Sequence, residues 1–112
     1  MIVSSLLLAL LQTAPAPVRL MSYDETVRCA GLTQAASELE GGESAEGKTL
    51  SDAALYWSLT AGQAATTAGK TPAQADADQT AARVRAVRAL SGGEDEARSE
   101  LQRCLRRTPE LG

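Results

Sequence analysis

The chain has 112 residues, of which 44% are hydrophobic and 22% are charged, and this size and composition fit one small domain with a single core. It contains no histidine, so Ser-His or Cys-His catalysis, histidine metal ligation and haem attachment are excluded. The formal net charge of −3 argues against nucleic acid as a partner.

The chain begins with an apolar segment that is typical of an export signal. Residues 2–11 read IVSSLLLALL, a run long enough for the core of a signal peptide and too short to cross a bilayer as a helix. Ala14 and Ala16 offer small residues for cleavage. We expect residues 1–17 to be a signal peptide and residues 18–112 to be the mature domain, without a transmembrane segment. Two alternatives are a helix of the mature domain and a start at Met21, which would place the protein in the cytoplasm.

Two cysteines lie near opposite ends of the expected mature chain, Cys29 and Cys104. An even pair of thiols in a small exported domain predicts a disulfide, and loop-closure entropy over about 75 residues gives about 4 kcal/mol of stabilisation. No CxxC motif is present. Buried free thiols and a redox pair are the alternatives. A structural disulfide favours a periplasmic or secreted location.

The first predicted helix spans residues 22–40. Ser22 and Glu25 form an S-x-x-E capping box at its start, and Gly41 and Gly42 end it. We expect four residues of this helix to face inward, namely Cys29, Leu32, Ala36 and Leu39. The glycine-rich, acidic stretch 41–48 predicts a flexible connection.

The second predicted helix, residues 50–68, carries Trp57, the only tryptophan, and Tyr56. We expect the other helices to pack around it, because aromatic burial is concentrated here. Its expected inward stripe is Leu50, Ala54, Trp57, Ala61, Ala64 and Ala68. Trp57 is expected in the core with Tyr56 at its edge, and the alternative is that the pair lines a groove for a peptide or lipid chain.

Two further helices are predicted over residues 72–90 and 94–107. Thr71, Pro72 and Gln74 mark the start of the first of these, and acidic and basic blocks at opposite ends of the second suit the helix dipole. The expected inward residues are Ala77, Ala81, Val84, Val87 and Leu90 in one helix, and Ala97, Leu101, Cys104 and Leu105 in the other.

The connections at residues 69–70 and 91–93 are short, which predicts antiparallel neighbours. We therefore expect an all-α domain, a small antiparallel four-helix bundle with up-down-up-down topology, closed by one disulfide between the first and last helices. Because alanine fills many inward positions, each helix buries little area and the bundle should depend on its cross-link.

The residues after Asp78 carry seven arginines and five acids, whereas the residues up to Asp78 carry four basic and nine acidic residues. Solvated helix faces explain much of this bias. The functional interpretation is a binding surface for an anionic partner, with the candidate residues Tyr56, Trp57, Arg85, Arg88, Arg103, Arg106 and Arg107.

No catalytic, metal-binding or cofactor-binding motif is present. The acidic stretch 38–46 lacks the ligand spacing of an EF-hand, and no S-x-x-K motif occurs. We therefore expect no enzyme activity, no metal and no cofactor. The leading hypothesis is a protein-interaction module of a bacterial cell envelope whose partner is another envelope protein. The alternatives are a small-ligand or lipid carrier with a cavity between alanine-rich helices, and an enzyme that uses clustered carboxylates.

Overall fold

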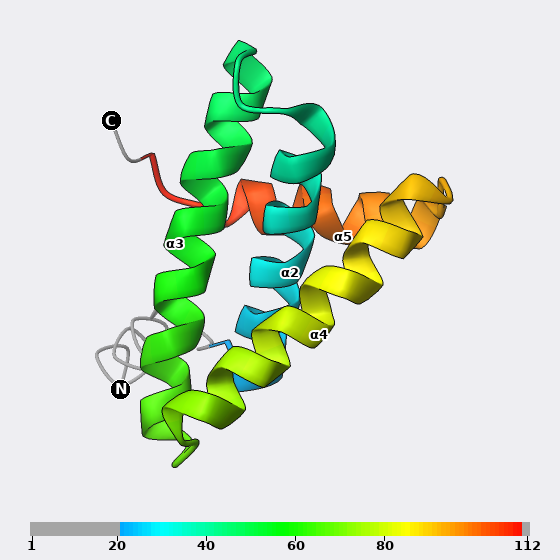
Figure 1. The fold of residues 1–112 in the computed structure, drawn as a ribbon. Helices are drawn as coiled ribbons and strands as arrows, with labels where there is room; N and C mark the ends of the chain where they lie inside the picture. Colours follow the sequence, from blue (N-terminus) through cyan, green and yellow to red (C-terminus); the bar gives the residue numbers. More distant parts are fainter. Residues whose placement is uncertain (1–20, 111–112) are drawn as a thin grey trace, which may run out of the picture.

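The structure is a computed structural model that describes residues 21–110. The predicted signal peptide, residues 1–17, lies outside the described residues. These residues form four α-helices and no strand, which confirms the all-α class (Figure 1). The helices are α2 (Tyr23–Glu40), α3 (Ala45–Thr67), α4 (Pro72–Ser91) and α5 (Asp95–Arg106). Within the described range, no helix is long and apolar enough to span a bilayer.

Side-chain caps set two of the helix starts. At α2, Ser22 Oγ accepts a hydrogen bond from Glu25 N at 3.1 Å, and Ser22 N donates to Glu25 Oε1 at 3.2 Å. At α4, Thr71 and Gln74 make the same reciprocal pair, with Pro72 at the first helical position. Each cap satisfies backbone N–H groups that have no partner inside the helix. Both capping boxes were predicted from the sequence and both are present.

The start of α3 differs from the expectation. The helix begins at Ala45 rather than Leu50, because Ser44 Oγ accepts a hydrogen bond from Gly47 N at 2.9 Å and caps an earlier turn. Gly47 is buried against the backbone of Gly41, where a side chain would not fit. The connection between α2 and α3 is therefore only residues 41–44. Its glycines indicated a longer flexible segment, but the serine cap outweighs their low helix propensity.

The helix at the centre of the fold is α2, and not α3 as the distribution of aromatic residues predicted. It packs against α3 and α4 along most of its length and against α5 over a shorter stretch, whereas α3 and α4 barely contact each other. Half of its residues are buried: Thr26, Val27, Cys29, Ala30, Gly31, Leu32, Thr33, Ala35 and Ala36. The prediction that Leu39 faces inward is wrong, since it is 51% exposed beyond the last packed turn.

The helices do not form a square of parallel rods. α2 and α3 run antiparallel side by side, α4 passes diagonally over α2, and α5 lies across it (Figure 1). The close passage of α4 depends on Gly31, where an added Cβ would lie 2.7 Å from the carbonyl carbon of Ala82. The regular up-down-up-down arrangement is therefore only partly realised, because one small residue lets α4 cross α2 at close range.

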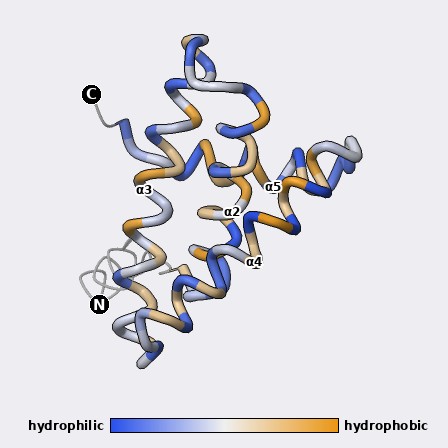
Figure 2. The backbone as a smooth tube through the Cα atoms, in the orientation of Figure 1, coloured by the Kyte–Doolittle hydropathy of each residue, from blue (hydrophilic) through white to orange (hydrophobic). Residues whose placement is uncertain are grey.

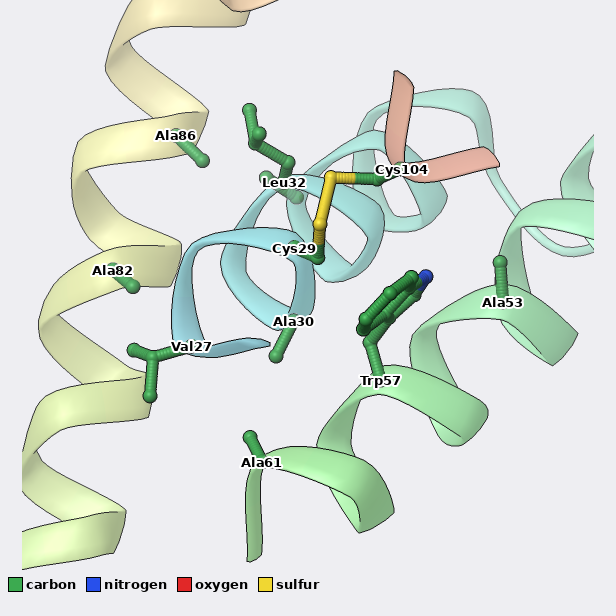
Figure 3. Close-up of a cluster of buried hydrophobic side chains, with 11 residues drawn as sticks. Val27, Cys29, Ala30, Leu32, Ala53, Trp57, Ala61, Ala82, Ala86 and Cys104 are labelled. Carbon is green, nitrogen blue, oxygen red and sulfur yellow. A yellow bond between two sulfur atoms is a disulfide. The ribbon is translucent and has the colours of Figure 1, made fainter. Parts of the chain in front are cut away.

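The core has two parts, one on each side of α2 (Figure 3). On one side, Trp57 lies beside the Cys29–Cys104 disulfide, which confirms that the first and last helices are joined. The Trp57 indole Nε1 donates a hydrogen bond to Thr108 Oγ1 at 2.8 Å. The other side holds four smaller or aliphatic side chains, Val27, Leu32, Ala82 and Ala86.

The inward stripe of α4 is rotated from the predicted one. Ala82 and Ala86 are buried and the expected Val87 and Leu90 are half-buried against the core, whereas Ala77, Ala81 and Val84 are exposed. Alanine occupies several faces of this helix, so its spacing does not single out one face.

In α3, the expected Ala54 and Ala64 are half-buried and Ala68 is exposed, while Ala53 and Ala65 are buried. In α5, Cys104 is buried and its three expected companions, Ala97, Leu101 and Leu105, are half-buried. Hydrophobic and hydrophilic stretches alternate along the helices (Figure 2).

Candidate binding groove

An open groove of about 560 Å³ lies between α2, α4 and α5. One wall is a continuous stripe of α4 at helical spacing: Asp78, Ala81, Ala82, Arg85, Ala86 and Ala89. From Asp78 to Ala89 this stripe covers three helical turns, or about 16 Å at 1.5 Å per residue. The groove is therefore elongated along α4 rather than compact.

The floor and the second wall come from α2 and α5. Val27 and Leu32 of α2, which are buried, close the floor together with Ala82 and Ala86. Charged residues form the rim, namely Asp24, Arg28, Lys70, Asp78, Arg85, Glu94, Glu96 and Glu100. The four floor residues are each at most 7% exposed, so the accessible lining of the groove is more polar than apolar.

One end of the groove is closed by Tyr23, Asp78 and Lys70. The Tyr23 hydroxyl donates a hydrogen bond to Asp78 Oδ2 at 2.8 Å, and Lys70 Nζ lies 5.5 Å from the centre of the Tyr23 ring. Partial burial, together with the hydrogen bond to Asp78 and the charge of that carboxylate, raises the pKa of Tyr23 to about 12. Tyr23 is therefore neutral at physiological pH and links the first turn of α2 to α4.

A second, smaller hollow of about 340 Å³ lies beside the disulfide. Its lining is Met21, Glu25, Arg28, Cys29, Glu100, Arg103, Cys104, Arg106 and Arg107. Arg28 and Glu100 border both the groove and this hollow, and they form an ion pair at 3.5 Å that separates the two. Arg107 lies 3.9 Å from Glu25. Four arginines against two glutamates make the hollow basic.

The structure divides the residues predicted to form one binding surface. Arg85 borders the groove, whereas three arginines border the basic hollow, Arg103, Arg106 and Arg107. Arg88 is exposed and borders neither. These arginines are therefore distributed over two hollows, because α4 and α5 diverge from the joint after Ser91 (Figure 1).

The two aromatic residues of α3 lie away from both hollows. Trp57 is 1% exposed and belongs to the core. Tyr56 is half-buried and packs edge-on against Trp57, with ring centroids 5.0 Å apart and planes at 78°. This arrangement matches the interpretation of Trp57 as a core residue with Tyr56 at its edge. Neither ring borders the groove.

Of the candidate binding residues predicted from the sequence, only Arg85 borders the groove, and Tyr23 and Asp78 were not predicted. Tyr23 and Asp78 are 55 residues apart in the sequence, and only the crossing of α2 and α4 brings them together. The one available signal was the run of small residues at spacings of three and four on α4, Ala82, Ala86 and Ala89, which marks a face that can approach another helix closely.

Among residues 21–110, no group of three or more cysteine or carboxylate side chains is placed to hold a metal ion. The disulfide joins both cysteines, so no free thiol is present in that range. No protein-family model matches this chain, and neither a curated protein nor a solved structure is significantly similar to it.

Proposed function

We propose that this protein is an exported, non-catalytic interaction module that binds a segment of another envelope protein in the groove between α2, α4 and α5. The observation that supports this function is the shape of the groove, which follows three turns of α4 and has a charged rim above buried apolar side chains. An elongated, open groove suits a peptide segment, whereas a small ligand is usually enclosed on most of its surface.

The disulfide supports the location that this function requires. Intramolecular disulfides persist in the periplasm or outside the cell, where thiols are oxidised, and are rare in the cytosol. The Cys29–Cys104 bond closes a loop of 75 residues, and the apolar start of the chain is typical of an export signal. Together they favour a periplasmic or secreted protein.

Site-specific photocrosslinking in the source cells tests the proposal. A photoreactive amino acid at Ala81, on the groove wall, should form an adduct with a defined protein. The same amino acid at Thr80, which is exposed on the opposite side of α4, should not. Equal labelling from both positions, or no protein adduct from Ala81, would contradict a groove-bound partner.

A small-ligand carrier is the second candidate, and the volume of the groove favours it. About 560 Å³ lies within the range of roughly 300–1,000 Å³ that small-molecule sites occupy. Native mass spectrometry of protein purified from its source separates the two functions. A retained small molecule at one-to-one stoichiometry supports the carrier, and a stoichiometric protein companion supports the interaction module.

A further inference from the structure

Few noncovalent contacts hold α5 to the rest of the domain. It packs against α2 over a short stretch and contacts α4 little. Of its twelve residues only Cys104 is buried, while Ala97, Leu101 and Leu105 are half-buried against the core. A helix of twelve residues is marginally stable by itself in water, so α5 depends on what attaches it to α2.

The polar contacts of α5 are weak attachments. Two ion pairs connect α5 and its C-terminal cap to α2, each with a largely exposed arginine: Arg28–Glu100 at 3.5 Å and Arg107–Glu25 at 3.9 Å. Such pairs contribute little, because water screens them. Beyond the helix, Thr108 accepts the hydrogen bond of the Trp57 indole. The covalent bond between Cys29 and Cys104 is therefore the main attachment of α5.

The basic hollow gives solvent a route to this bond. Cys29 and Cys104 are each 5% exposed, and both border the hollow of about 340 Å³. The hollow has room for a thiol group beside the two cysteines. Thiol–disulfide exchange requires this access, because the attacking thiolate must reach a sulfur atom.

The charge of the hollow favours the same reaction. Two of its four arginines are in the ion pairs with α2 or α5 glutamates described above. The side chains of the other two, Arg103 and Arg106, form no ion pair or hydrogen bond within the described part of the chain. Positive charge attracts an incoming thiolate and stabilises the thiolate that leaves.

We propose that the Cys29–Cys104 bond is a redox-sensitive switch, which a dithiol reductant reaches through the basic hollow and opens to release α5 from α2. A thiolate of the reductant bonds to one cysteine sulfur, the S–S bond breaks, and the other cysteine leaves as a thiolate. The second thiol of the reductant then attacks the mixed disulfide. The reductant leaves as a disulfide, and the protein gains two electrons and two protons as two thiols.

Release of α5 changes two parts of the molecule. It separates Thr108 from the Trp57 indole, and it removes the wall of the groove to which Ala97 and Glu100 belong. The switch therefore controls whether the groove exists, whatever the groove binds, and the inference goes beyond the proposed function.

Hydrogen exchange of the full protein before and after reduction with dithiothreitol tests the release. Without denaturant, we expect the α5 amides to exchange at least about tenfold faster after reduction, while those of α2 and α3 stay protected. The Cys29→Ser, Cys104→Ser double variant is the control, because dithiothreitol should not change its exchange. Unchanged protection of α5 in the reduced wild type, or equal loss in all four helices, would overturn the switch.

The rate of reduction by dithiothreitol tests the route. Direct attack on the folded protein should show little dependence on urea below the unfolding transition, whereas reduction that requires global unfolding accelerates as urea raises the unfolded fraction. The Arg103→Gln, Arg106→Gln pair should slow reduction about two- to fivefold at low salt, and added salt should remove the difference.

A second pair of exposed arginines provides the matched control. Arg88 and Arg98 do not border the hollow, so the Arg88→Gln, Arg98→Gln pair should be reduced at the wild-type rate. Circular dichroism checks that both pairs fold. If the rate rises steeply from the lowest urea concentrations, or if the two pairs are reduced at equal rates, entry of the reductant through the basic hollow is wrong.

Discussion

The side of α2 that faces α3 and α5 is packed with large and covalently joined groups, whereas the side that faces α4 is packed with small ones. The first side holds the Trp57 indole, its hydrogen bond to Thr108 and the Cys29–Cys104 disulfide. The second holds the close approach of Gly31 to Ala82 and has the groove beside it.

This difference indicates how so small a domain keeps an open groove. Burial of a large aromatic side chain and a long-loop disulfide each contribute several kcal/mol, which is a large fraction of the stability of a domain this size. The α4 side can then remain lined by alanines, which bury little area per residue. Stability is concentrated on one side of α2, and the groove lies on the other.

The largest effect should come from removing the indole. Trp57→Ala leaves a cavity at a position that is 1% exposed and also removes the hydrogen bond to Thr108, so we expect a loss of about 3–5 kcal/mol in the free energy of unfolding. Urea titration followed by circular dichroism measures it. Leu55→Ala, at a position 59% exposed on the same helix, is the control and should cost well under half as much. Equal costs would contradict the concentration of stability around Trp57.

Loss of the disulfide should have the next largest effect. The Cys29→Ser, Cys104→Ser double variant should be destabilised by about 2–4 kcal/mol, since it releases a loop of 75 residues in the unfolded chain. α5 has few other contacts, so its amides should lose protection first in hydrogen exchange, before those of α2 and α3. A uniform loss of protection across all four helices would show that the bond does not hold α5 in particular.

Substitution of glycine should distinguish the crossing of α2 and α4 from an open helix face. Gly31→Ala places a Cβ 2.7 Å from the backbone of Ala82, and we expect a loss of about 1–3 kcal/mol despite the better helix propensity of alanine. Gly62→Ala, where the added Cβ meets nothing within 4 Å beyond its own stretch of helix, should instead gain about 0.5–1 kcal/mol. Thermal unfolding compares them. If both substitutions stabilise the protein, the close contact of Gly31 with Ala82 is not required for α4 to pack against α2.

The smallest effect concerns Tyr23 at the end of the groove. Its pKa is raised to about 12 in the folded protein from about 10 in the unfolded chain, so the folded state retains the proton longer. The free energy of unfolding should therefore fall as the pH rises from about 10 to 12. Tyr23→Phe should remove this component and, through the lost bond to Asp78, cost about 1 kcal/mol at neutral pH. In the control variant Tyr56→Phe, the free energy of unfolding should still fall over this pH range. If the free energy of unfolding of Tyr23→Phe depends on pH as that of the wild type does, the assignment of the fall to Tyr23 is contradicted.

Local signals in the sequence predicted much of the fold. The capping boxes at Ser22 and Thr71 and the glycines at 41 and 92 mark helix ends through contacts within a few residues. The early start of α3 was missed, because composition pointed to a loop while a single serine cap started the helix at Ala45. The disulfide partners were predicted because the chain has only two cysteines.

The groove was not predictable in the same way. The buried face of α4 depends on which of several alanines contacts α2. Because alanine occurs on more than one face of this helix, the hydrophobic periodicity does not predict which face is buried. Tyr23, Asp78 and Glu100 share the groove only because α4 and α5 both cross α2. For the same reason, Arg85 borders the groove whereas Arg103, Arg106 and Arg107 border the separate basic hollow.

The sequence by itself determined the helical class, the principal helix ends and the pairing of Cys29 with Cys104, because each depends on nearby residues or on the absence of any other partner. The tertiary structure decided that α2 is the central helix and that the groove lies on its α4 side. The physical reason is steric: Gly31 and Ala82 allow α4 to cross close to α2, and because α5 also lies across α2, a groove remains between the three helices.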